Sequence, residues 1–380
     1  MKKKIHFAGL DGLRFISIFF VILHHLFTFK NYYGFYQFDF PRIGLIGYYG
    51  IQFFFAGSGF LITYLLLTEY GRNGKISLKN FYIRRILRIW PAYYVLIFLA
   101  LIIALKHPFF RIPGLTDDYL AGNYRTGNFL FFSFLPHIAS AYSSTAPYVH
   151  QTYTIGIEEQ FYFLWGMLFF FAARYAKWIF YLILICVPLL NLFHDLFYDF
   201  SLKENVYSFK NYFFKLITYI KYCRFSTFAL GSLLAYAFFL EKKWVNIFKS
   251  VIAQIIIYSI LIISIIFDLS IPYFRDEYIA VLTLCVFSIA TFKNESLINY
   301  DTKWLSFLGK ISYGIYLFHI FAIVIAIKIC TELFHFNITT FWQMIILVIT
   351  TMALSILLGW LSYYSVEKFF LRIKKKFAKV

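Results

Sequence analysis

Apolar residues in this chain occur in long, nearly unbroken runs rather than in short alternating stretches. The runs at 251–267 and 344–361 are almost entirely apolar, whereas a barrel strand would alternate over about ten residues. In the bilayer core every backbone N–H and C=O must be paired within its span, which a continuous run achieves as a helix. The pattern predicts an all-α, polytopic transmembrane helix bundle. We place about ten spans, near 10–29, 48–68, 89–105, 157–173, 178–194, 222–240, 250–267, 278–292, 311–327 and 342–364.

The composition agrees with a membrane protein. Only 14% of the residues are charged and 61% are hydrophobic, against about 25% charged in ordinary soluble domains. The net charge of +18 would suggest nucleic acid as a partner of a soluble protein. In a membrane protein the location of that charge matters more, and no nucleic-acid partner is expected.

Lysine and arginine concentrate on one side of the predicted bundle. Segments on the side of the N-terminus hold 23 of them, whereas the opposite loops, although longer in sum, hold 11. The positive-inside rule therefore predicts that both termini face the cytoplasm. The chain is accordingly expected to be a multi-pass protein of the cytoplasmic membrane.

The first apolar run is predicted to be a span and not a cleavable signal peptide. It follows three lysines, as a signal peptide would, but it carries Arg14, His24 and His25, and no small-residue cleavage site follows it. There is no internal repeat, linker or appended soluble domain, so residues 1–380 are predicted to form a single membrane-embedded domain.

The four cysteines are interpreted as packing residues. They are scattered through apolar segments without the spacing of metal ligands, at Cys186, Cys223, Cys285 and Cys330. No metal and no tightly bound cofactor are therefore expected.

Two predicted outer segments are long, at 106–156 and 195–221. Loops of this length are uncommon unless they are functional or disordered, so these two segments are candidates for binding an acceptor substrate. The alternative is a plain tether between spans. The many aromatic residues of 106–156 favour an ordered cover that lies at the membrane interface.

The first predicted span carries three ionisable side chains. Arg14 and His25 are eleven positions apart, about three helical turns and ~16 Å, so they share one face, whereas His24 points about 100° away. Histidine can act as a general base near neutral pH, which attack of an alcohol on a thioester requires. The alternative is a histidine that merely bonds a neighbouring helix, but with Arg14 on its face we interpret His25 as catalytic.

Three arginines stand at the entrance of the third predicted span. Arg84, Arg85 and Arg88 suit phosphate recognition, because a guanidinium offers a planar fork of donors to phosphate oxygens. Coenzyme A carries phosphates and is cytoplasmic, and its extended arm could reach from this entrance to His25. For any single arginine, ordinary positive-inside anchoring is a strong competing explanation.

Two further motifs carry polar groups. Glu158 and Glu159 stand at the outer end of the fourth predicted span, where Glu159 is explained by the positive end of the helix dipole. Glu158 could instead orient His25 or bind the acceptor. In the ninth span Ser312, Tyr316 and His319 form a stripe, which favours interhelical hydrogen bonds first and contact with a substrate second.

The small residues of 53–62 allow close packing of helices. We interpret this run as a packing segment that could also form the floor of a channel for a thin acyl arm.

Taken in order, these segments resemble the acyltransferase-3 family of integral-membrane O-acyltransferases. The resemblance runs through Leu10–Arg14 with His25, Phe53–Ile62, Arg84–Pro91, Glu158–Tyr162 and Ile311–His319. It implies acyl-CoA, with acetyl as the expected acyl group, as co-substrate, and a hydroxyl of an extracytoplasmic saccharide or cell-envelope glycan as acceptor. It also implies essential roles for Arg14, His25, Arg85, Arg88 and Glu158.

One departure from the family is visible, because Tyr153-Thr154 stands where the family usually has Trp-Ser. Some members add a soluble hydrolase-like domain, so a soluble partner of this chain is expected to be a separate protein. A transporter without acyl-transfer chemistry is the competing class, but the inverted repeats and broken helices frequent in transporters are not evident. A purely structural or lipid-binding protein would leave Arg14 and His25 without a reason to be intramembrane.

Overall fold

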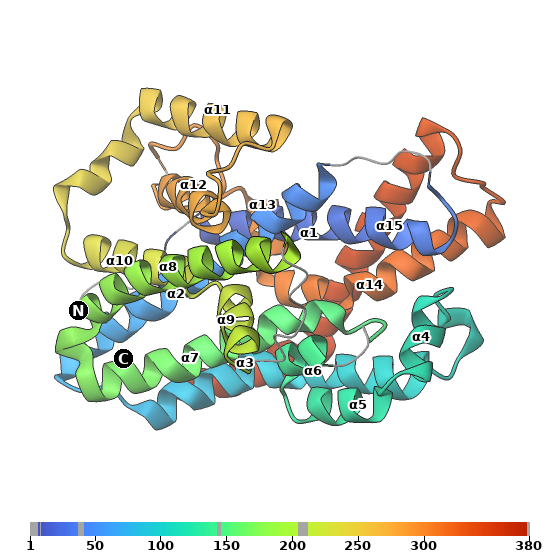
Figure 1. Cartoon of the computed structure of the whole chain (residues 1–380), viewed down its shortest axis with the longest axis horizontal. Coiled ribbons are helices and arrows are strands. Elements are labelled where there is room, and N and C mark those ends of the chain that lie inside the picture. The colour runs from blue at the N-terminus through green and yellow to red at the C-terminus, as the bar shows by residue number, and fades with distance from the viewer. Residues whose placement is uncertain are drawn as a thin grey trace. The chain divides into compact units, whose positions relative to one another are not determined.

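The computed structural model describes residues 7, 9–36, 42–142, 146–203, 212–292 and 294–377, and its regular structure there is entirely helical (Figure 1). The α-helices are α1 (Leu10–Tyr32), α2 (Ile43–Asn73), α3 (Leu78–Phe98), α4 (Leu115–Ala121), α5 (Tyr124–Phe132), α6 (Pro136–Tyr142), α7 (Tyr153–Ala172), α8 (Ala176–Lys203), α9 (Tyr212–Cys223), α10 (Phe225–Phe239), α11 (Val251–Phe267), α12 (Arg275–Ala290), α13 (Lys303–Lys310), α14 (Ser312–Lys328), α15 (Phe341–Ser362) and α16 (Lys368–Lys374). Short π-helical segments are η1 (Leu99–Ala104), η6 (Ile329–Leu333) and η7 (Tyr363–Glu367), and 3₁₀ segments are η2 (Pro108–Phe110), η3 (His150–Thr152), η4 (Ala173–Tyr175), η5 (Lys243–Lys249) and η8 (Lys375–Phe377). The all-α expectation is confirmed for this part of the chain.

The predicted spans fall largely on helices, but 222–240 is interrupted at Arg224 between α9 and α10. Not all of these helices reach membrane-spanning length. Within the described residues, six helical stretches are long and apolar enough to cross a membrane, and a seventh if the bent pair η5 and α11 is one span. One stretch, His150–Leu196, is 47 residues long and holds two predicted spans on either side of η4. Helix α10 has only 15 residues. The count of about ten spans and the cytoplasmic location of the termini remain predictions.

The chain divides into two compact units. The first unit comprises Met1–Leu13, Gln52–Leu78 and Phe161–Asp301, and the second comprises Arg14–Ile51, Lys79–Gln160 and Thr302–Val380. Every residue that the sequence proposes for the site belongs to the second unit.

In the first unit, α2 and α10 approach one another closely at two glycines. A Cβ atom on Gly59 would lie 2.3 Å from the carbonyl oxygen of Phe228, and one on Gly231 would lie 2.2 Å from that of Ala56. A hydroxyl of α10 also accepts a hydrogen bond from Thr63 of α2, over 2.8 Å. The interpretation of 53–62 as a packing segment is thus confirmed at Gly59.

Gly59→Ala is expected to destabilise the protein by about 1–3 kcal/mol, because the new methyl group would force two backbones apart. Gly57→Ala is the matched control: its Cβ would meet the Phe287 ring at 3.2 Å, and a side chain can shift. Thermal unfolding of both variants in detergent micelles tests this. A Gly59→Ala protein that melts with the wild type would contradict the close contact.

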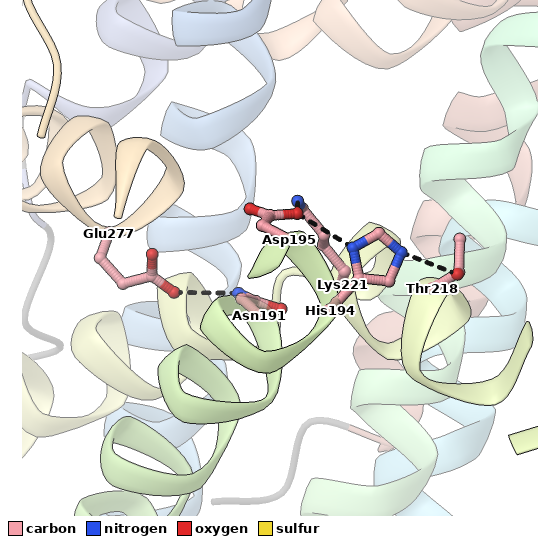
Figure 2. A network of polar contacts seen from close by, with 6 residues as sticks. All are labelled: Asn191, His194, Asp195, Thr218, Lys221 and Glu277. Carbon is pink, nitrogen blue, oxygen red and sulfur yellow. Dashed lines mark hydrogen bonds and ion pairs between the residues drawn. The ribbon is translucent and has the colours of Figure 1, made fainter. Parts of the chain in front are cut away.

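The first unit also contains a polar network on α8 and α9 (Figure 2). His194 Nδ1 lies 2.9 Å from a carboxylate oxygen of Asp195, which also pairs with Lys221. The other ring nitrogen of His194 lies 3.0 Å from the Thr218 hydroxyl. Ionisable groups on apolar helices are costly unless paired, and this arrangement pairs them. Apart from His194, it belongs to the predicted outer segment 195–221, of which 204–211 lies outside the described residues.

A second pair extends the network to α12. The side-chain amide of Asn191 donates to a carboxylate oxygen of Glu277 over 3.2 Å (Figure 2). The Ser226 hydroxyl donates to the same oxygen over 3.3 Å. These contacts join α8, α10 and α12 by polar groups within an otherwise apolar packing. The network therefore has a structural role: it holds these helices of the first unit together.

In the second unit, most of the predicted outer segment 106–156 is helical and packed. Tyr93 of α3 donates its hydroxyl proton to the carbonyl of Phe131 over 2.7 Å, and Tyr148 donates to that of Phe110 over 2.5 Å. Tyr119 is fully buried and bonds Asn128. Apart from 143–145, which lie outside the described residues, the segment is ordered as expected, and its location at the membrane interface stays a prediction.

Candidate active site

Helix α1 carries Arg14 and His25 on one continuous α-helix, as the apolar periodicity predicts. Eleven residues of α-helix separate them, which is a rise of ~16 Å. Arg14 is half-buried and His25 is 9% exposed. One helix therefore connects a permanent cation to an imidazole three turns further along.

The imidazole of His25 contacts the imidazole of His319 on α14. His25 Nδ1 lies 2.8 Å from His319 Nε2, and the two rings are nearly parallel, at 22°. His319 is fully buried, and its Nδ1 lies 2.6 Å from the carbonyl oxygen of Tyr316. The sequence proposed both histidines for the site, but it gave no reason to expect them to touch.

His24 faces a different neighbour, as its position on the helix requires. A Cβ on Gly47 of α2 would lie 2.5 Å from the Cβ of His24, and one on Gly44 would lie 3.9 Å from the His24 ring. Glycine at position 47 thus lets α2 approach α1 directly over His24. This environment gives His24 a packing role.

The stripe on α14 makes the interhelical hydrogen bonds that the sequence favoured. The Tyr316 hydroxyl donates to the carbonyl of Gln151 over 2.8 Å and lies 2.6 Å from the Thr154 hydroxyl. Gln151 in turn donates its side-chain amide to the carbonyl of Leu317 over 2.7 Å. Ser312 is buried in the first turn of the same helix. Helix α14 is therefore fixed against the start of α7.

Helix α14 is held equally closely by α15. A Cβ on Gly314 would lie 2.9 Å from the carbonyl oxygen of Gly359, and one on Gly359 would lie 2.7 Å from the backbone nitrogen of Ile315. Small residues let two helix backbones approach in this way. The element that carries His319 is thus clamped on two sides.

Four arginines and one lysine gather around α16. Arg14, Arg84, Arg85 and Arg88 all interact electrostatically with Lys374. Arg84 also donates to the carbonyl oxygen of Phe377 over 2.9 Å. We call these five residues the basic cluster. Sequence reasoning proposed the arginines and missed Lys374, which stands in a run of three lysines with no local sign of which one turns inward.

Two buried or half-buried carboxylates accompany the basic cluster. Glu367 is 5% exposed, accepts a hydrogen bond from Ser362 over 2.9 Å and interacts with Arg88. Glu159 interacts with Arg85. The four arginines of the basic cluster outnumber these two carboxylates.

The helix-dipole explanation of Glu159 is wrong. Helix α7 begins at Tyr153, so Glu159 lies in its second turn, and no acidic residue occupies the first turn. The dipole effect falls off within the first turn of a helix. The favourable partner of the Glu159 carboxylate is instead Arg85. Glu158 lies within electrostatic reach of Tyr316, so it belongs to the same unit as His25 and His319.

A further histidine, His137 of α6, has a structural environment. The side-chain amide of Gln160 donates to His137 Nε2 over 2.7 Å, and a Cβ on Gly156 would lie 2.2 Å from His137 Nδ1. Burial lowers the pKa of His137 to about 4, so the ring is neutral near pH 7. It attaches α6 to α7 without offering a charge.

Comparison with known proteins agrees with these features. A family model described as an acyltransferase domain matches residues 7–360. The chain is 26% identical to the Bacillus subtilis (strain 168) protein named "Putative peptidoglycan O-acetyltransferase YrhL", over 96% of this chain and 54% of that protein. It is 31% identical to "Peptidoglycan O-acetyltransferase OatA" of Listeria monocytogenes, over 45% of this chain and 25% of that protein.

The chain spans about half the length of the Bacillus relative. No solved structure matches it. The family match extends from residue 7 to residue 360 and so includes all the motifs of the first three spans, α7 and α14. The chain therefore belongs to the acyltransferase-3 family.

Proposed function

We propose that this protein transfers an acetyl group from cytoplasmic acetyl-CoA to a hydroxyl of a cell-wall glycan outside the membrane. The observation that carries the proposal is the arrangement along α1, where the basic cluster surrounds Arg14 and the His25–His319 pair lies ~16 Å further along the same face. An elongated donor with phosphates at one end and a thioester at the other fits this arrangement. The names of the two relatives support peptidoglycan as the acceptor.

The basic cluster suits the phosphate end of the donor. Like charges repel one another, so four arginines that outnumber their two neighbouring carboxylates favour the arrival of an anion. Arg84, Arg85 and Arg88 can each offer paired N–H donors to phosphate oxygens. Lys374 adds an amine from α16 whose positive charge burial and the four arginines disfavour, so an arriving phosphate would favour its protonation. Arg14 joins this cluster and orients the donor along α1.

His25 is proposed as the general base. It takes the proton of the acceptor hydroxyl while the hydroxyl oxygen attacks the thioester carbonyl carbon. When the resulting tetrahedral intermediate collapses, the carbon–sulfur bond breaks and His25 returns the proton to the leaving sulfur. Glu158 is proposed to bind the acceptor close to Tyr316 of α14. Among the residues of the stripe, Ser312 and Tyr316 are proposed to line the site.

The proposal requires that the basic cluster faces the cytoplasm and that the acceptor approaches from the opposite side. The excess of Lys and Arg on the side of both termini supports this orientation. The enzyme would then carry out its reaction across the cytoplasmic membrane, with lipid around its apolar helices.

The direct test uses the purified full chain in proteoliposomes, with acetyl-CoA labelled in its acetyl group and peptidoglycan fragments as acceptor. We expect base-labile label on the glycan and release of free coenzyme A in equal amounts. An exporter would leave the thioester intact. In cells, deletion of the gene should reduce O-acetyl esters on peptidoglycan, and loss from another envelope polymer alone would reassign the acceptor.

A further inference from the structure

The hydrogen bonds of the two histidines determine where their protons lie. The carbonyl oxygen of Tyr316 has no proton to give, so His319 Nδ1 must carry the hydrogen that spans their 2.6 Å. A neutral imidazole has one N–H, so His319 Nε2 is left as an acceptor. Across the 2.8 Å to His319, His25 Nδ1 must therefore be the donor.

This assignment leaves the lone pair of His25 on Nε2. That nitrogen has no hydrogen bond to any of the described residues, and His25 keeps 9% exposure. His319, by contrast, is fully buried and uses both ring nitrogens. A substrate can meet His25 Nε2 directly, but it can meet His319 only through His25.

We infer that His319 is a positioning residue that fixes the tautomer and the ring orientation of His25, so that Nε2 is the basic nitrogen. This inference rests on the proposed role of His25. It replaces the substrate-lining role that the sequence suggested for His319.

During the reaction the acceptor hydroxyl proton moves to His25 Nε2, and the ring becomes an imidazolium with hydrogens on both nitrogens. Its Nδ1–H stays bonded to His319 Nε2, which can share the new positive charge. The proton leaves from His25 Nε2 to the sulfur when the carbon–sulfur bond breaks. His319 therefore ends each cycle unchanged, and no other proton source is needed.

A neutral partner suits this location. In many hydrolases a buried carboxylate orients the catalytic histidine, but an unpaired carboxylate within an apolar span is costly. An imidazole that is itself held by a backbone carbonyl supplies an acceptor without a net charge. That carbonyl belongs to Tyr316, whose hydroxyl is fixed by Gln151 and Thr154. The residue that holds His319 is therefore itself held in place.

The test compares His319→Phe with His319→Gln in the full chain. Phenylalanine keeps a flat ring but removes the acceptor, so kcat should fall about 10–100-fold, as when a metal-ligating histidine loses its hydrogen-bond partner. Glutamine can place a carbonyl oxygen near the position of Nε2, so it should recover most of the lost kcat. The KM for acetyl-CoA should be unchanged in both variants. His335→Phe, at an exposed histidine of the same unit, is the matched control and should behave like the wild type.

The outcomes separate this inference from the proposed function. Wild-type kcat in His319→Phe, alongside an inactive His25→Ala, would overturn the positioning role and leave the proposed function intact. Equal losses in the Phe and Gln variants, in step with lower melting temperatures, would show a merely structural role and overturn it too. If His319→Phe does not fold, His319→Met takes its place as the apolar variant. No acetyl transfer by the wild type would overturn the proposed function and this inference with it.

Discussion

His25→Ala is expected to fold, to bind the acyl donor and to lose almost all acetyl transfer. A general base contributes about 10²–10⁴-fold to turnover, and alanine offers no nitrogen at the position of Nε2. Donor binding should survive because the basic cluster lies about three helical turns away along α1. The measurement is acetyl transfer per folded molecule, together with the affinity for acetyl-CoA.

His24→Ala is the matched control, since it removes the same side chain one position earlier on the same helix. Its imidazole packs over Gly47 of α2, and among the described residues no hydrogen bond joins it to His319. Its loss should therefore act through stability, as the loss of a packed side chain does, and activity per folded molecule should remain substantial. An inactive His24→Ala beside a near-normal His25→Ala would show that the wrong face of α1 has been assigned.

Much of this fold follows from the sequence because the bilayer limits the alternatives. Long apolar runs must become helices in lipid, and the helix period alone separates the faces of His24 and His25. The number of crossings does not follow as simply. The run at 222–240 became a helix of only 15 residues, because hydropathy marks apolar residues and does not determine where a helix is broken.

The partners of the site residues could not be predicted, because they come from distant parts of the chain. His25 and His319 are separated by 294 positions, and nothing in either motif encodes which helices pack together. Lys374 reaches the arginines only through the course of α16. Glu159 was misinterpreted because the predicted span 157–173 began four residues after the true start of α7 at Tyr153.

At Tyr153-Thr154, where this chain departs from the family pattern, the structure explains why threonine is tolerated at position 154. Thr154 Oγ1 lies 2.6 Å from the hydroxyl of Tyr316. Serine, which the family usually has there, would supply the same hydroxyl. Threonine therefore preserves the hydrogen bond that fixes α14. A change in acceptor specificity would have to come from Tyr153.

Arg88→Ala is expected to weaken acetyl-CoA binding by about 10–100-fold, because hydrogen bonds to charged groups contribute about 1.5–3 kcal/mol each. Arg88→Lys should recover part of that affinity: it keeps the charge beside Glu367 but lacks the planar fork of donors. Equilibrium binding at two salt concentrations measures both effects, and the loss should be greater at low salt because salt screens exposed charges. Arg372→Ala removes an exposed arginine of α16 and serves as the control. Equal donor affinity in the wild type, Arg88→Ala and Arg88→Lys would assign the basic cluster to membrane anchoring, because positive-inside residues need only charge and not a phosphate partner.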